Sequence, residues 1–309
     1  MTDTAILAED LRKTFGEVVA VDHISLAVPR GTVLGLLGVN GAGKTTMVRM
    51  LTTVLAPTAG RAVVNGFDVH EHPQAVRRSI GLAGQFAAVD ENLTGRENLI
   101  LIGRLNHLTK QASRGRADDL LAQFRLDDAG HRPARTYSGG MRRRLDLAAA
   151  LITHPPVLFL DEPTSGLDPA SRLDLWGVIE GLVSDGTTVL LTTQYLEEAD
   201  RLADNIVVID HGRVAAEGTP RQLKSRLGDT VIEFEFTNST TAETAAHTLS
   251  ASTSAGTIVR VVMSDGASTL REALNRLETA GISPHHVALR EPTLDDVFLT
   301  LTANNGAPE

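Results

Sequence analysis

The fold of this chain is decided by one stretch, Val33-Leu34-Gly35-Leu36-Leu37-Gly38-Val39-Asn40-Gly41-Ala42-Gly43-Lys44-Thr45. Residues 33–37 form a short apolar run, which is typical of a buried strand. Residues 38–45 match G-x-x-x-x-G-K-[ST], a loop whose backbone N–H groups surround phosphate oxygens at the start of a helix. From average residue usage this match arises by chance in roughly one chain per hundred of this length, so an ordinary glycine-rich turn is disfavoured.

The residue types in this loop predict a phosphate ligand together with magnesium. The glycines let successive backbone N–H groups turn inward, Lys44 neutralises the terminal phosphates, and the hydroxyl of Thr45 is a ligand for Mg²⁺. We expect nucleotide contacts from Gly38, Asn40, Gly41, Ala42, Gly43, Lys44, Thr45 and Thr46.

A second motif ends an apolar run with two carboxylates, in the order Val157-Leu158-Phe159-Leu160-Asp161-Glu162-Pro163. An acid at the tip of a strand beside a phosphate-binding loop is placed to hold magnesium, which predicts that role for Asp161. Glu162, the next residue, is placed to polarise the attacking water. A strand capped by solvated acids is a common alternative for this motif alone. The phosphate-binding loop is what favours the functional interpretation.

A third motif, Tyr137-Ser138-Gly139-Gly140-Met141, precedes a stretch that is expected to be helical through Leu151. Ser138 is a suitable N-cap, and the two glycines leave backbone donors bare, so the start of this helix can bind an anion. The alternative is a capped helix with no ligand.

Taken in order, these motifs resemble the ATP-binding-cassette (ABC) family of ATPases. Four segments carry the likeness, in the family's order. They resemble Walker A (Lys44), the signature (Ser138-Gly139-Gly140), Walker B (Asp161-Glu162) and the D-loop (Ser165-Gly166-Leu167-Asp168). Gln85 resembles the Q-loop glutamine, and Phe15 resembles the aromatic residue that stacks on adenine. A place in the core is the alternative for Phe15. The resemblance covers residues 5 to about 225.

The resemblance implies ATP hydrolysis between two chains that pair head to tail. Each ATP would lie between the phosphate-binding loop of one copy and the signature segment of the other, so one chain needs a second copy of itself. The implied catalytic set is Lys44, Glu162 and Gln194. The implied magnesium ligands are Thr45, Gln85 and Asp161. The implied nucleotide contacts outside the loop are Phe15, Gln85, Ser138, Gly139, Gly140 and Asp168.

Two positions depart from the family pattern. The first signature position, usually leucine, is Tyr137, and the position of the usual switch histidine is Gln194. An amide can donate a hydrogen bond to a γ-phosphate, but it cannot carry a charge. A contact of Gln194 with the γ-phosphate would therefore act through an uncharged hydrogen bond alone.

Within the family, three segments resemble the daunorubicin/doxorubicin-resistance ATP-binding subunits: residues 137–141, 192–200 and 291–298. This resemblance implies an ATPase that powers a membrane exporter of drugs or lipids, with an integral-membrane permease as partner and a place on the cytoplasmic face of the cell membrane. The alternative is a soluble ABC ATPase that acts on nucleic acid or ribosomes. The repair type carries long coiled coils or zinc cysteines and the translation type carries two cassettes, and this chain has neither.

The hydrophobic pattern predicts an α/β protein with two domains. Apolar runs such as Val33–Leu37, Val157–Leu160 and Ile206–Ile209 alternate with helical stretches, which indicates a buried sheet covered by helices. With the resemblance this becomes a P-loop NTPase core over residues 1–225, with a helical subdomain at about 88–150. Residues 226–309 are expected to form a small α+β accessory domain, because strands that alternate in polarity flank a helix there.

Composition narrows the function further. Lys and Arg total 29 and Asp and Glu total 38, a formal net charge of −9, so the chain as a whole has no electrostatic reason to bind nucleic acid. Cysteine is absent, which excludes disulfides and thiol catalysis. The sequence has no secretory signal pattern and no run of about 18 apolar residues, so a membrane role would come through a partner.

Three weaker candidates remain. The basic triplet Arg142–Arg144 is expected on a solvated or partner-facing helix surface rather than on nucleic acid. His70 with His72, and His285 with His286, lack a third ligand nearby in the sequence, so we expect no metal beyond nucleotide-bound magnesium.

Overall fold

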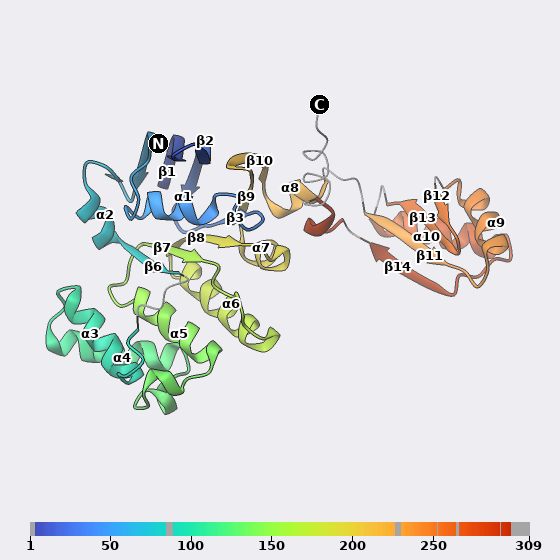
Figure 1. Ribbon diagram of the computed structural model, residues 1–309. Helices are drawn as coiled ribbons and strands as arrows, with labels where there is room; N and C mark the ends of the chain where they lie inside the picture. The colour runs from blue at the N-terminus through green and yellow to red at the C-terminus, as the bar shows by residue number, and fades with distance from the viewer. Residues whose placement is uncertain are drawn as a thin grey trace. The chain divides into compact units, whose positions relative to one another are not determined.

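The computed structural model describes residues 4–84, 89–225, 230–251, 253–263, 266–290 and 292–297. The chain divides into two compact units, Met1–Pro220 and Arg221–Glu309 (Figure 1). The first unit ends at Pro220, whereas the sequence predicted an end at residue 225. Helix α8 (Pro220–Ser225) lies between these two positions.

The centre of the first unit is a sheet of six strands in the order β10-β9-β3-β8-β7-β6. Its strands are β3 (Val33–Leu37), β6 (Ile80–Ala83), β7 (Val157–Asp161), β8 (Thr188–Thr193), β9 (Asn205–Asp210) and β10 (Arg213–Gly218). All neighbours pair in parallel except β9 and β10. Every residue of β3, β7 and β8 is buried, which explains their continuous apolar sequence. The predicted α/β fold is confirmed.

A second, antiparallel sheet covers one side of this core in the order β2-β1-β4-β5. Its strands are β1 (Thr4–Phe15), β2 (Val18–Pro29), β4 (Ala59–Val64) and β5 (Phe67–Asp68). Helix α1 (Lys44–Leu51) lies beside both sheets (Figure 1). It shares one hydrophobic core with them, which includes Met47 and Leu51 of the helix, Ile6 of β1 and Leu36 of β3. The antiparallel sheet was not predicted from the sequence.

Helices and short 3-10 turns make up the rest of the first unit: α2 (Pro73–Ser79), α3 (Gly95–Leu105), α4 (Lys110–Gln123), η1 (Asp127–Ala129), η2 (Ala134–Thr136), α5 (Gly139–Ala150), α6 (Pro169–Ser184) and α7 (Leu196–Leu202). Their starts are encoded locally. The hydroxyl of Thr94 accepts from the backbone N–H of Glu97 and the Glu97 carboxylate accepts from Thr94, a capping box. Ser138 and Asp168 cap α5 and α6 in the same position. Each of these helices begins where a side-chain acceptor replaces a missing carbonyl.

The second unit is a βαββαβ arrangement, with strand order β12-β13-β11-β14 and antiparallel pairing throughout. Its elements are β11 (Val231–Glu235), α9 (Ser239–Leu249), β12 (Thr253–Ala255), β13 (Ile258–Val262), α10 (Gly266–Thr279) and β14 (His286–Arg290). Ile232, Phe234 and Val259 of the sheet pack against Ala245 of α9 and Leu277 of α10.

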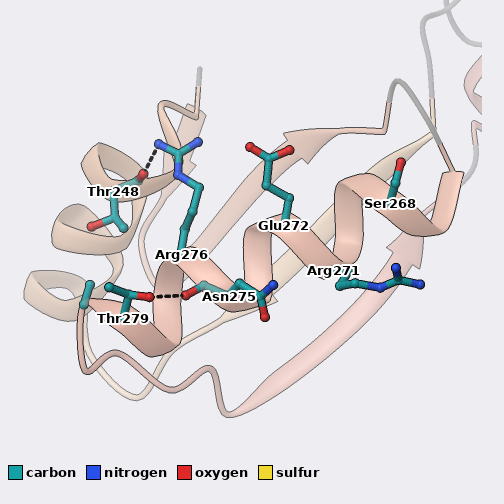
Figure 2. Close-up of a pocket in the computed structure, with 8 residues that line it drawn as sticks. Thr248, Ser268, Arg271, Glu272, Asn275, Arg276 and Thr279 are labelled. Carbon is teal, nitrogen blue, oxygen red and sulfur yellow. Dashed lines mark hydrogen bonds between the residues drawn. The ribbon is translucent and has the colours of Figure 1, made fainter.

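A surface groove of about 560 Å³ lies beside α9 and α10 (Figure 2). Arg276 of α10 donates to the backbone carbonyl of Thr248 and to the Ser250 hydroxyl, and Thr279 donates to the backbone carbonyl of Asn275. These contacts stay within the C-terminal unit and link α10 to the end of α9.

Candidate functional site

The phosphate-binding loop joins β3 to α1 and leaves the first N–H groups of the helix free. Gly43 is the N-cap of α1 and no side chain caps it, which distinguishes this helix from α3, α5 and α6. Gly43 has a φ of 113°, and a Cβ atom there would lie 2.5 Å from the Ala20 carbonyl oxygen. Only glycine satisfies both conditions. Free N–H groups at a helix start are suited to phosphate oxygens.

The ammonium group of Lys44 lies inside this loop. Its Nζ donates to the backbone carbonyls of Gly38 at 2.7 Å and Val39 at 3.1 Å, and it lies 3.9 Å from Oε1 of Glu162. Burial lowers the pKa of Lys44, and the charges of Glu162 and Asp161 act in the opposite direction. A weakly solvated cation between a phosphate-binding loop and two carboxylates is a suitable partner for terminal phosphates.

Asp161 and Thr45 meet at the carboxyl end of β7. The Thr45 hydroxyl donates to Asp161 Oδ1 at 3.2 Å, and the Thr192 hydroxyl of β8 donates to the same oxygen at 2.6 Å. Asp161 is almost fully buried. A hydroxyl and a carboxylate oxygen side by side are hard ligands of the kind that Mg²⁺ takes when phosphate and water supply the rest. These two residues therefore fit a magnesium ion, while Gln85, the third predicted ligand, lies outside the described residues.

Glu162 follows Asp161 in an uncommon backbone conformation. Its φ is 50°, in the left-handed region that non-glycine residues rarely adopt. Its N–H donates both to the carbonyl oxygen of Thr192 at 3.1 Å and to its hydroxyl at 3.0 Å. Strained residues of this kind are concentrated at functional sites. Thr192, which the sequence did not single out, thus contacts both acids of the motif.

Phe15 is exposed, with half of its side-chain surface accessible, so the alternative interpretation as a core residue is wrong. It lies at the tip of the β1–β2 hairpin, opposite Val18. The Lys13 ammonium is 5.3 Å from the centre of its ring and donates to the Ala56 carbonyl at 2.7 Å. An exposed aromatic ring is available for stacking.

The signature segment lies apart from the phosphate-binding loop. Ser138 and Gly139 are exposed at the start of α5, and no hydrogen bond among the described residues joins them to the loop. A Cβ atom at Gly140 would lie 2.8 Å from the Ser171 hydroxyl, which donates to Asp168 at 2.6 Å. The signature and the D-loop residue Asp168 are therefore neighbours within one chain.

Tyr137, the departure at the first signature position, is a structural residue of the helical layer. This layer is the part of the first unit that contains α3, α4 and α5. It is buried, and its hydroxyl donates to the Ala129 carbonyl at 2.7 Å. Its ring end rests on Gly95, where a Cβ atom would lie 2.2 Å from the hydroxyl oxygen. The tyrosine therefore does not disturb the exposed Ser138 and Gly139 that follow it.

Gln194 directly follows β8, whose end holds the Asp161 carboxylate and the Glu162 backbone N–H through Thr192. The Gln194 side chain is exposed. Its place one strand away from Glu162 is compatible with a contact to the same ligand.

The sequence interpretation of Arg142–Arg144 as a solvated or partner-facing surface is wrong for Arg143. The guanidinium of Arg143 donates to backbone carbonyls at the ends of β6 and β7, including that of Glu162. Arg142 pairs with Glu91 at 2.7 Å, and Arg144 donates to the Phe124 carbonyl at 3.2 Å. Nothing in the sequence separated Arg143 from its neighbours, because all three occupy consecutive positions on an amphipathic helix.

A buried carboxyl group lies on α7, four residues after Gln194 in the sequence. Glu198 of α7 has no exposed surface and accepts a hydrogen bond from Nε1 of Trp176 in α6 at 3.0 Å. Burial raises the pKa of Glu198 above the ordinary glutamate value, although hydrogen bonds from Thr193, Trp176 and Thr164 lower it. The net upward direction means that this carboxyl ionises less readily in the folded chain than in the unfolded chain.

This burial predicts a pH-dependent effect of Glu198→Gln on stability. Below the unfolded-state pKa of about 4.3 both states are protonated, and above it the buried carboxyl resists ionisation, so stability is lost as pH rises through the raised folded-state pKa. Glutamine does not titrate. We therefore expect the free energy of unfolding of Glu198→Gln, relative to wild type, to increase in urea titrations as pH rises above about 4.3. A difference that stays constant with pH would contradict it.

The described residues contain no group of three or more His, Asp or Glu side chains that could hold a metal ion. His70 with His72, and His285 with His286, therefore lack a third ligand among them. In the same part of the chain, no helix is long and apolar enough to cross a membrane.

Comparison with known proteins adds independent findings. A family model described as ABC transporter matches residues 21–165, and one described as the C-terminal domain of DrrA1-3-like ATP-binding proteins matches residues 218–302. The chain is 52% identical over 309 residues to the daunorubicin resistance ATP-binding protein DrrA3 of Streptomyces coeruleorubidus, covering 99% of this chain and 98% of that protein. It is 48% identical to the doxorubicin resistance ATP-binding protein DrrA of Mycobacterium tuberculosis, covering 98% and 95%.

Solved structures agree on the fold. The structure of an ATP-binding subunit of an ABC transporter superposes with a TM-score of 0.66 at 28% identity, covering 72% of this chain and 93% of that one. The family predicted from the motifs is confirmed.

Proposed function

Because the chain belongs to the ABC transporter ATP-binding proteins of the daunorubicin/doxorubicin-resistance type, we propose that it powers a membrane exporter of drugs or lipids. As a member of this family it binds and hydrolyses ATP. The observation that carries the proposal is the convergence of Lys44, Thr45, Asp161 and Glu162 at the carboxyl ends of β3 and β7, within a chain matched along its whole length by resistance proteins.

The residues of the site have separate roles in ATP hydrolysis. The free N–H groups of the loop and the Lys44 ammonium bind the β- and γ-phosphates and offset the charge that develops on the transferred group. The Glu162 carboxylate, 3.9 Å from Lys44, orients the attacking water and takes its proton. Phe15 stacks on the adenine ring. The γ-phosphate accepts a hydrogen bond from the Gln194 amide, which donates without changing charge.

Thr45 and Asp161 are the described residues that would hold Mg²⁺, with Gln85 as the further ligand that the family pattern implies. When bound, the ion neutralises phosphate charge. Thr192 keeps the Asp161 carboxylate oriented toward Thr45 by donating to the same oxygen.

A second copy of the chain completes the site. Ser138 and Gly139 are exposed at the start of α5, without a hydrogen bond to the loop of their own chain among the described residues, and so they are accessible to the γ-phosphate bound by a partner copy. Asp168 lies beside them and is held by Ser171. This placement supports a head-to-tail pair with two ATP molecules at its interface.

We further propose that an integral-membrane permease couples this pair to export, which places the chain at the cytoplasmic face of the cell membrane. The test combines the purified chain with the membrane protein encoded beside its gene in inside-out vesicles. We expect ATP-dependent uptake of daunorubicin or of a labelled lipid, absent with Glu162→Gln. ATPase activity that responds to nucleic acid or ribosomes, with no uptake into vesicles, would instead favour a soluble ABC ATPase.

A further inference from the structure

Arg143 connects the start of the signature helix to the ends of two strands. Its Nε donates to the Pro163 carbonyl at 2.6 Å, and Nη1 donates to the Gly84 carbonyl at 2.7 Å. Its Nη2 donates to the carbonyls of Asp161 at 3.1 Å and Glu162 at 3.0 Å. All three nitrogens of one side chain therefore bind main-chain oxygens at the ends of β6 and β7.

The peptide groups on either side of Glu162 are held from opposite directions. Thr192 of β8 accepts the N–H of Glu162 with two oxygens, and Arg143 of α5 donates to its carbonyl. Between these contacts the residue has its left-handed φ of 50°. A non-glycine residue keeps this conformation only where the surrounding structure imposes it. Thr192 and Arg143 do so together with the N–H of Ser165, which donates to the Glu162 carbonyl at 3.3 Å.

We propose that Arg143 is a positioning residue for ATP hydrolysis, which holds the Glu162 peptide in its left-handed conformation and thereby fixes where the Glu162 carboxylate points. The inference rests on the proposed role of Glu162 as the group that activates water. Arg143 acts through the main chain and does not itself contact the reacting atoms. Because the same side chain belongs to α5, it also joins the helix that begins at Ser138 to the peptide that carries the general base.

The chemistry of this contact requires arginine. A guanidinium presents five N–H groups in a rigid plane, and the three nitrogens of Arg143 donate to four carbonyls. A lysine ammonium has three donors on one atom, so it can donate to at most three of these carbonyls. Arg143 makes no hydrogen bond to Lys44, Thr45 or the loop among the described residues, so we expect the direct phosphate contacts of these residues to persist without it.

The experiment measures steady-state ATPase rates and equilibrium ATP affinity for Arg143→Lys and Arg143→Ala. A displacement of about 1 Å at a catalytic group costs on the order of 100-fold in rate. We expect kcat to fall roughly 100-fold in Arg143→Ala and about tenfold in Arg143→Lys, with the Kd for ATP unchanged within about twofold. The matched control is Arg144→Lys, because Arg144 is the next residue of α5 and its one hydrogen bond within the described ranges goes to the Phe124 carbonyl at the end of α4. Its kcat should equal that of wild type.

A double variant separates positioning from general damage. If Arg143 acts through Glu162, then adding Arg143→Lys to Glu162→Gln should leave the residual rate unchanged, because the group being positioned is already gone. Multiplicative losses in the double variant would overturn the proposal. So would a kcat of Arg143→Lys within twofold of wild type, or losses in ATP affinity as large as those in kcat. A Glu162→Gln protein with wild-type turnover would instead refute the proposed role of Glu162. The failure of that role and the failure of the Arg143 proposal are therefore distinguishable.

Discussion

Glu162→Gln is expected to abolish ATP turnover while ATP binding persists. The glutamine side chain has nearly the same shape as glutamate and would occupy the same place near Lys44. Its amide, however, cannot accept a proton from water. Loss of a general base typically removes a factor of about 100 to 10,000 in rate. The Kd for ATP should stay close to that of wild type, because Lys44 and the free N–H groups of α1 are unchanged. Steady-state phosphate release and equilibrium binding of a fluorescent ATP analogue measure the two quantities.

The control for this variant is Glu180→Gln, which makes the same substitution in an exposed residue of α6 that pairs with Arg201 at 2.9 Å. Exposed pairs contribute about 0 to 1 kcal/mol to stability, so no change in turnover is expected. Near wild-type turnover in Glu162→Gln would show that another group activates the water.

Lys44→Ala should weaken ATP binding itself rather than turnover alone. The lost interaction is a charged hydrogen bond to phosphate, worth roughly 1.5 to 3 kcal/mol, which corresponds to a rise in Kd of about 10- to 150-fold. The carbonyls of Gly38 and Val39 also lose their donor, so the loop that presents the backbone N–H groups becomes less ordered. Isothermal titration with ATP measures the effect directly.

Lys110→Ala is the matched control for Lys44→Ala, because Lys110 is an exposed lysine at the start of α4 in the helical layer. Its ATP affinity should equal that of wild type. An unchanged Kd in a folded Lys44→Ala protein would contradict the assignment of the loop as the phosphate site.

The central sheet could be predicted because its strands are buried on both faces. Every residue of Val33–Leu37 and Val157–Asp161 is buried. Strands that are buried on both faces have continuous apolar sequences, so they can be recognised without a pattern of alternating polarity. The loop after β3 and the acids after β7 could be placed on the same edge, because parallel strands end together. The contacts of Lys44 with Glu162 and of Thr45 with Asp161 follow from that geometry.

The antiparallel sheet could not be predicted in the same way. Asp10 in β1 and His23 in β2 have positive φ values, and the pairing of these strands shifts register around Asp10. Each shift resets which residues face the core, so the alternation of period two is broken within one strand. Helix α9 was missed for another reason, since its buried face consists of Ala242, Ala245 and Leu249 amid threonines that have low helix propensity.

Arg143 and Glu198 were beyond sequence reasoning because their roles depend on partners far away in the chain. Arg143 bonds carbonyls up to 59 residues away, and Glu198 bonds a tryptophan 22 residues away. Backbone carbonyls carry no residue type, so no motif records them. A charged residue on a helix has the same appearance in the sequence whether water or a strand end surrounds it.

The contact between Tyr137 and Gly95 has a consequence for how homologous sequences can vary. The tyrosine hydroxyl occupies the volume that a side chain at position 95 would need. A larger residue at 95 is therefore tolerated only when position 137 becomes smaller, for example leucine, and the reverse change opens room for tyrosine. The two positions form a compensating pair, so the size of the residue that fits at one position depends on the size of the residue at the other. In this chain the first signature residue is thus a packing residue of the helices.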